Sequence, residues 1–265
     1  MATVGQKELW LPTDNGQVYI RTWVHDQNSA QHASPIVLFH DSLGCVGLWR
    51  DFPAQLAAAT RRDVIAYDRQ GFGLSSPYSE TISSDFIREE AKFFATLTDH
   101  LGIETFIAFG HSVGGAMALN CAARFPEQCL AVVSVSAQAF VEDQTLLGIK
   151  TAKAQFEQAR HFERLQKYHG EKSQWVLNAW TQTWLSESFA DWTIERGLGQ
   201  ILCPVLVIHG VEDEYGSAAH PERIAQLSVN RSEILMLNNC HHVPHREMPE
   251  VVINAIQRFV SSLSR

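Results

Sequence analysis

The stretch from Phe106 to Leu119 constrains the fold of this chain more than any other. It reads F-I-A-F-G-H-S-V-G-G-A-M-A-L, which is an apolar run of strand type, a serine flanked by glycines and a run of helix-forming residues. The pattern G-x-S-x-G is typical of a sharp strand–turn–helix in which side chains at Gly110 and Gly114 would collide with neighbouring elements. Such a turn holds the Ser112 hydroxyl clear of the backbone, beside the unpaired amides that begin the next helix. We therefore predict a nucleophilic serine at position 112.

Strand and helix patterns alternate on both sides of this turn. A hairpin is predicted at the start, with strands at 8–11 and 17–24 around Asn15-Gly16. Further strand-type runs lie at 35–39, 63–67, 106–109, 131–135, 204–208 and 234–237. Helical periodicity covers 49–60, 84–101, a segment from about 221, and 249–263. This alternation predicts βαβ units and a parallel sheet.

The alternation stops between residues 142 and 199, where the pattern is helical and four of the seven tryptophans lie. One helical stripe runs from Ile149 to Phe162. We expect one α/β domain, with a core made of residues 1–141 and 200–265 and a helical cap made of residues 142–199. The tryptophans either attach the cap to the core or line a ligand pocket beneath it, and both roles are compatible.

The composition narrows the class of partner. A chain of 265 residues with 45% hydrophobic residues is long enough to bury one large core. Its net charge of −8 argues against nucleic acid or an anionic membrane as a partner, and no apolar run approaches the roughly 18 residues that span a bilayer. The first ten residues lack the basic and apolar regions of a signal peptide, so we expect a cytoplasmic location. The five scattered cysteines form no C-x-x-C pair and are expected to be reduced thiols, mostly in the core.

A serine hydroxyl becomes a nucleophile only when a base lies within hydrogen-bond reach and a carboxylate orients that base. Asp213 comes just after the predicted strand 204–208, and His242 comes just after the strand 234–237. Both therefore belong to the carboxyl edge of the sheet, where open α/β sheets hold their ligands. Glu142 or Asp143, which follow the strand 131–135, are the alternative source of the carboxylate.

Four segments in this order resemble landmarks of the α/β-hydrolase superfamily, and in particular of its capped single-domain esterases and carbon–carbon hydrolases. They are D-R-Q-G-F-G-L-S at 68–75, G-H-S-V-G-G at 110–115, G-V-E-D at 210–213 and H-V-P-H-R-E-M-P at 242–249. The resemblance covers the whole chain except the cap. It implies an α/β-hydrolase fold: an eight-stranded, mostly parallel sheet flanked by helices, with the helical cap inserted after the sixth strand.

The resemblance also implies roles for individual residues. Ser112 would be the nucleophile, His242 the general base and then acid, and Asp213 the orienting carboxylate, with the neighbouring Glu212 and Glu214 facing away. The oxyanion hole would consist of the backbone amides of Val113 and Ser42. In the loop that carries Ser42, the usual His-Gly is here His40-Asp41. A side chain at position 41 either changes the backbone angles of the loop or places a carboxylate near the pocket. His40 is expected to brace this loop and His111 to support the serine turn by hydrogen bonding. The candidate residues of the substrate pocket are His40, Asp41, His111, Trp180 and Trp184.

The predicted function is a serine hydrolase that cleaves a small ester, lactone or related carbonyl substrate through an acyl-enzyme. We expect no metal and no cofactor, and the aromatic cap predicts an apolar or aromatic substrate. One alternative is a carbon–carbon bond hydrolase of the 1,5-diketone type, since Ser42 stands where such enzymes often have a serine. Two further alternatives are a cofactor-free dioxygenase that uses the His/Asp pair and a non-catalytic ligand sensor. A haloalkane dehalogenase or an epoxide hydrolase would require aspartate in place of Ser112.

The remaining histidines have simpler interpretations. His241, His242 and His245 lie close together, but no H-E-x-x-H or matching carboxylate pattern of a metal site accompanies them. His241 and His245 are therefore expected to pack or cap within their loop. The sequence does not predict the oligomeric state.

Overall fold

A computed structural model describes residues 4–25, 33–196 and 201–263. Within these residues, eight strands form one sheet in the order β1-β2-β4-β3-β5-β6-β7-β8. β1 (Gly5–Thr13) and β2 (Gly16–Val24) form the predicted antiparallel hairpin, and β2 also pairs antiparallel with β4. The other neighbours pair in parallel: β3 (Ile36–Phe39), β4 (Val64–Tyr67), β5 (Phe106–His111), β6 (Cys129–Val135), β7 (Val205–Gly210) and β8 (Ser232–Leu237). The prediction of an eight-stranded, mostly parallel sheet is therefore confirmed.

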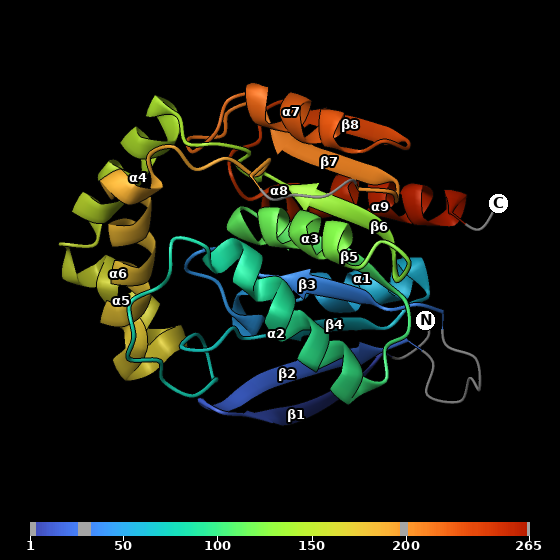
Figure 1. Cartoon of the computed structure of the whole chain (residues 1–265), viewed down its shortest axis with the longest axis horizontal. Helices are drawn as coiled ribbons and strands as arrows, with labels where there is room; N and C mark the ends of the chain where they lie inside the picture. Colours follow the sequence, from blue (N-terminus) through green and yellow to red (C-terminus); the bar gives the residue numbers. More distant parts are fainter. Residues whose placement is uncertain (1–3, 26–32, 197–200, 264–265) are drawn as a thin grey trace.

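Helices cover both faces of the sheet (Figure 1). α1 (Phe52–Thr60) and α9 (Pro249–Ser262) pack on one face, and α2 (Phe86–Leu101), α3 (Val113–Arg124) and α7 (Ala219–Leu227) pack on the other. Successive strand residues point to opposite faces, so that in β3 Ile36 and Leu38 join one core while Val37 and Phe39 join the other. Burial on both faces explains why these strands read as unbroken apolar runs in the sequence.

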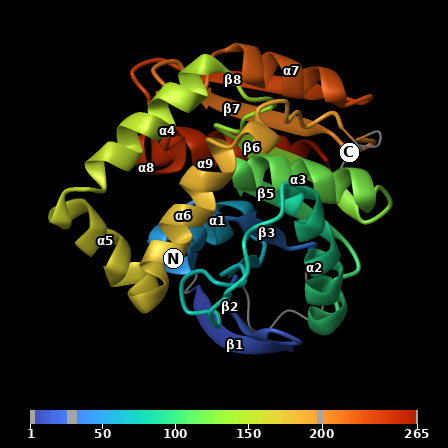
Figure 2. The ribbon, with the colours of Figure 1, turned by 60° about the vertical axis from the view of Figure 1, so that its left-hand side comes forward.

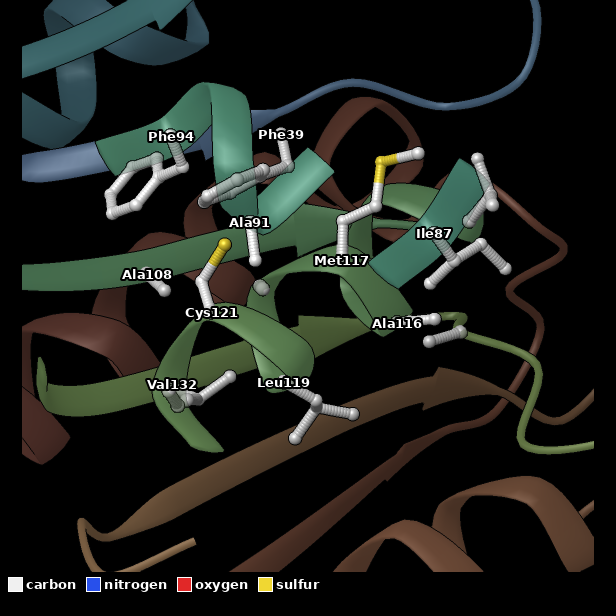
Figure 3. Packing of buried hydrophobic residues seen from close by; sticks show 14 of the residues in the cluster. Phe39, Ile87, Ala91, Phe94, Ala108, Ala116, Met117, Leu119, Cys121 and Val132 are labelled. Atoms are coloured by element: carbon white, nitrogen blue, oxygen red, sulfur yellow. The ribbon is translucent and has the colours of Figure 1, made fainter. Parts of the chain in front are cut away.

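The core beneath α2 and α3 shows how tightly the strand before the serine turn is held (Figure 3). The Phe94 ring of α2 lies 5.2 Å from the Phe39 ring and 4.7 Å from the Phe106 ring, measured between centroids. These contacts are in the range of favourable aromatic pairs. They pack the last residue of β3 and the first residue of β5 against α2, and both strands lead into the loops described below.

Among the described residues between β6 and β7 there are three α-helices, namely α4 (Asp143–Gln155), α5 (Ala159–His169) and α6 (Ser173–Trp184). They lie together beside the edge at which the parallel strands end (Figures 1 and 2). The stripe predicted as one helix from Ile149 to Phe162 is interrupted, because α4 ends at Gln155 and α5 starts at Ala159. After a short 3₁₀ turn, η3 (Glu187–Phe189), the helical pattern ends and Thr193 forms an isolated bridge with Phe140. The predicted helical segment up to 199 is thus too long at its end, and residues 197–200 lie outside the described residues.

Two smaller boundaries also differ from the prediction. The helix expected at 49–60 is split into the 3₁₀ turn η1 (Val46–Trp49) and α1, which begins at Phe52 with Pro53 in its first turn. Proline is favourable there because its missing amide would be unpaired in any case. The loop expected after β8 contains the short helix α8 (Pro244–Glu247), which also begins with proline.

Two further expectations concern the cysteines and membrane-spanning helices. The five cysteines are free and buried, in agreement with the prediction of reduced core thiols. Across the described parts of the chain, no helix combines the length and the apolar character needed to cross a membrane.

Candidate active site

The turn between β5 and α3 holds Ser112 in a backbone conformation that is rare for any residue with a side chain, with φ 56° and ψ −128°. The two glycines of the motif make this turn possible. A Cβ atom at Gly110 would lie 2.0 Å from the Gly114 carbonyl oxygen, and one at Gly114 would lie 2.1 Å from the carbonyl oxygen of Phe39. The predicted steric reason for both glycines is therefore confirmed.

Asp213 and His242 meet at the same edge of the sheet, in the loops after β7 and β8. Each carboxylate oxygen of Asp213 lies 2.9 Å from Nδ1 of His242. The amide of Tyr215 also donates to Asp213 Oδ1 at 2.8 Å, which fixes the carboxylate. Because a carboxylate only accepts hydrogen bonds, Nδ1 of His242 carries the ring proton and Nε2 is left as a base.

The electrostatics of this pair favour an ionised Asp213. Burial by itself raises the pKa of Asp213, but the contacts with His242 outweigh it, so the pKa is lowered overall. Burial by itself lowers the pKa of His242, whereas the charge and hydrogen bond of Asp213 raise it, and the net direction is upward. His242 is therefore the member of the pair suited to taking up and releasing a proton.

Neither alternative carboxylate forms a hydrogen bond or an ion pair with His242 in the described part of the chain. Glu142 accepts hydrogen bonds from the amide of Ser217 at 2.7 Å and from its hydroxyl at 3.0 Å, and it faces His220 at 2.9 Å. Asp143 is the first residue of α4. The structure thus brings Asp213, and not Glu142, to His242.

The Ser112 hydroxyl donates to Oε1 of Gln138 at 3.5 Å, and no hydrogen bond joins Ser112 to His242 among the described residues. Hydrogen bonds between catalytic groups are often long or absent until substrate binds. Gln138, which belongs to the segment after β6, is a site residue that was not predicted from the sequence. A search for polar side chains after every strand of the parallel sheet would have found it.

The loop after β3 is braced by His40, as expected. The ring of His40 donates from Nδ1 to the Asp41 carbonyl at 2.8 Å and accepts at Nε2 from the amide of Arg69 at 3.1 Å. The Arg69 guanidinium also donates to the Asp41 carbonyl, at 2.8 Å. Asp41 itself has no left-handed φ, and its carboxylate lines the cavity described next. Of the two expectations for this side chain, the second is therefore the one that the structure supports.

A cavity of about 280 Å³ lies at this edge of the sheet. Ser112 and His242 line it together with Ser42 and all five candidate pocket residues. Trp175 and Trp192 do not line it: the Trp175 ring donates to the carbonyl of Glu80, and the Trp192 ring stacks on Phe189 at 5.4 Å. The cavity wall also contains residues that the sequence analysis did not assign to a pocket: Leu43, Cys45, Leu48, Trp49, Gln138, Thr145, Ile149, Glu214, Tyr215, Val243, His245 and Arg246.

Three of the predicted residues need separate comment. Glu214, expected to face away, lines the cavity, because the chain turns at Asp213 and carries the next residues along the rim. His245, expected to pack within its loop, does pack on Trp49 at 4.9 Å but also forms part of the cavity wall. Val113 is not among the residues that line the cavity; it is the first residue of α3, directly after Ser112, and the first amides of a helix have no partner within the helix.

The fold and this site define the class of protein. A family model of the alpha/beta hydrolase fold matches residues 34–247. The chain therefore belongs to the α/β-hydrolase fold family and is a serine-type hydrolase.

Individual relatives agree with this class. The chain is 25% identical over 249 residues to the serine hydrolase BPHL of Mus musculus, which covers 89% of this chain and 82% of the relative. It is 35% identical to the putative carbamate hydrolase RutD of Pseudomonas savastanoi pv. phaseolicola over 116 residues, which is 43% of either chain. Among solved structures, a membrane phospholipase A described as a bacterial virulence factor superposes with a TM-score of 0.78 at 21% identity, over 98% of this chain and 87% of that chain. At that identity the likeness shows a common fold.

Proposed function

We propose that Ser112, His242 and Asp213 are a catalytic triad that cleaves a small ester, lactone or related carbonyl substrate through an acyl-enzyme. One observation carries the proposal: a serine in a strained turn and a histidine oriented by a buried carboxylate face one cavity. The three residues come from three different loops: Ser112 and His242 line the cavity, and Asp213 holds His242 from behind.

The proposed reaction follows from the proton positions. Nε2 of His242 takes the proton of the Ser112 hydroxyl while Oγ forms a bond to the substrate carbonyl carbon. The amides of Val113 and Ser42 stabilise the oxyanion. The leaving group departs with the proton from His242, and a water molecule, deprotonated by the same ring, then cleaves the acyl-enzyme. Asp213 stays ionised throughout and stabilises the imidazolium.

The cavity supports a small substrate with an apolar or aromatic group. Its volume of about 280 Å³ lies at the lower end of ligand pockets, which measure roughly 300–1,000 Å³. The rings of Trp180 and Trp184 and the side chain of Ile149 form an apolar wall on the side of α4 and α6. The names of two relatives, a serine hydrolase and a putative carbamate hydrolase, are compatible with cleavage at a carbonyl carbon. A cytoplasmic location is part of the proposal and rests on the sequence.

Carbon–carbon bond hydrolysis of a 1,5-diketone is the second candidate, because Ser42 lines the cavity together with Ser112. A cofactor-free dioxygenase would use only the His242–Asp213 pair, and it is distinguished by oxygen consumption in proportion to substrate.

The experiment is a screen of p-nitrophenyl esters of graded chain length beside a lactone and a 1,5-diketone, combined with labelling by a fluorophosphonate. Ser112→Ala should lose labelling and about 10⁴-fold or more in kcat. Ser136→Ala is the matched control, since Ser136 also has a positive φ, of 48°, and does not line the cavity. This variant should keep both the labelling and the kcat of the wild type. Retention of most esterase activity by Ser112→Ala would refute the proposal.

The apolar wall makes a second prediction. Trp180→Ala should raise KM and move the optimum towards longer acyl chains, because the substitution enlarges the cavity. Trp175→Ala is the control, since Trp175 belongs to the same helix but contacts Tyr78 and Phe72 outside the cavity. It should lower stability and leave the chain-length profile unchanged. Identical profiles for the two variants would contradict the assigned wall.

A further inference from the structure

His111 connects the loop of the proposed base to the loop after β3. One ring nitrogen, Nε2, lies 2.8 Å from the backbone carbonyl oxygen of His242. The other, Nδ1, lies 3.3 Å from Oδ2 of Asp41. The second oxygen of Asp41 accepts a hydrogen bond from the amide of Leu43 at 2.9 Å. A single chain of hydrogen bonds therefore runs from Leu43 through Asp41 and His111 to His242.

The donors and acceptors in this chain fix the number of protons. A carbonyl oxygen only accepts, so Nε2 of His111 must carry a proton. In a neutral ring Nδ1 would then present a lone pair to the carboxylate, and the two would repel. Both hydrogen bonds can form together only if the Asp41–His111 pair carries one proton more than an ionised carboxylate and a neutral ring would carry. Burial raises the pKa of Asp41, but the hydrogen bond and charge of His111 outweigh it and lower the pKa overall, which favours an ionised carboxylate that accepts the hydrogen bond.

Two further histidine rings pack around His111. The His245 ring packs against it edge-on at 4.7 Å, and burial, followed by the charge of His111, lowers the pKa of His245 far below its usual value. His245 is therefore neutral. The His242 ring lies 5.1 Å away, with its own carboxylate partner Asp213 on its other side. Arg246 and Glu214, of opposite charge, also line the cavity.

We propose that Asp41 is a positioning residue which, through a proton shared with His111, holds the carbonyl of His242 and the loop of Ser42 in register. The inference rests on the proposed function, because it assigns Asp41 to the alignment of the proposed base with the proposed oxyanion amides. One carboxylate then sets two loops that approach Ser112 from different strands. Since His111 directly precedes Ser112 in the chain, the serine turn is part of the same unit.

Two substitutions of Asp41 separate the hydrogen bonds from the shared proton. Asp41→Ala removes both contacts and should lower kcat about 10- to 100-fold with little change in KM. Asp41→Asn keeps an oxygen for the Leu43 amide, which forces the asparagine NH₂ group to face His111. That group can donate to Nδ1 of a neutral ring, whose Nε2 proton still reaches the His242 carbonyl. Asp41→Asn should therefore retain kcat to within about threefold.

Rescue by the conservative variant distinguishes positioning by hydrogen bonds from a merely structural role. Asp41→Leu is close in size to Asp41→Asn, but its side chain offers no acceptor to the Leu43 amide and no partner to His111. Its kcat should therefore fall as far as that of Asp41→Ala, while Asp41→Asn keeps kcat. Glu212→Gln is the control: this exposed carboxylate pairs with His241 and does not line the cavity, so its kcat should match the wild type.

The outcomes are separable from those of the proposed function. A wild type that fluorophosphonate does not label at Ser112 overturns the proposed function itself. If the wild type is labelled and active, then equal kcat values for Asp41→Asn and Asp41→Leu overturn the positioning role, and so does an unchanged kcat in a folded Asp41→Ala. Should Asp41→Ala fail to fold, the comparison of Asp41→Asn with Asp41→Leu still decides.

Discussion

The strained backbone of Ser112 predicts that glycine stabilises this position although alanine is usually the more stable residue. A side-chain-bearing residue at φ 56° and ψ −128° costs about 1–3 kcal/mol of strain. Glycine adopts these angles freely but loses about 0.5–1 kcal/mol through its greater freedom in the unfolded chain. The difference leaves Ser112→Gly about 1 kcal/mol more stable than Ser112→Ala. For a chain of this length the melting temperature should rise by about 2–4 °C.

Thermal and urea unfolding of the two variants measure this difference directly. Both variants lack the hydroxyl, so the comparison contains no contribution from its hydrogen bonding. The matched control is Ser173, a buried serine in the helical region with φ −56° and ψ −38°. There Ser173→Gly should be about 1 kcal/mol less stable than Ser173→Ala. Greater stability of the alanine variant at both positions would show that the backbone of Ser112 is not strained.

Two further predictions concern the proposed base and the turn. Because Asp213 raises the pKa of His242 and the base must be neutral, kcat/KM should increase as pH rises through a pKa above the usual 6.5. Asp213→Asn should move this rising part of the pH profile to lower pH and reduce kcat about 10⁴-fold. A pH profile of kcat/KM that Asp213→Asn leaves in place would contradict the assignment. Gly114→Ala places a Cβ 2.1 Å from the Phe39 carbonyl oxygen, whereas Gly102→Ala meets nothing within 4 Å and only the strain of φ 64°. Urea midpoints should show Gly114→Ala as the more damaging change, by at least about 1–2 kcal/mol, and equal midpoints would show that the backbone moves aside without cost.

The sheet could be predicted because its strands are buried on both faces and therefore appear as apolar runs. Val37 and Phe39 face one core while Ile36 and Leu38 face the other, so no polar residue interrupts the run. The residues of the proposed triad could be located because each follows such a run.

The cavity wall was less predictable because it depends on short local turns. The helix α8 begins at Pro244 and turns His245 and Arg246 towards the cavity, but four helical residues leave no periodicity in a sequence. Glu214 likewise reaches the rim through the turn after Asp213. Gln138 belongs to no sequence motif, and only its position after a strand identifies it as a candidate site residue.

The connection between β6 and β7 has a consequence for how such chains diversify. These strands are neighbours, paired from Val132 with Val205 to Val135 with Ile208, so the long excursion between them starts and ends at fixed points of one rigid sheet. Doubling the length of a closed excursion costs only about 0.6 kcal/mol of chain entropy. Insertions and deletions in this segment therefore change the stability of the fold little, although they alter the cavity wall formed by Ile149 and Trp180. We therefore expect changes in this segment to alter the proposed pocket while the serine turn and the His242 loop keep their geometry.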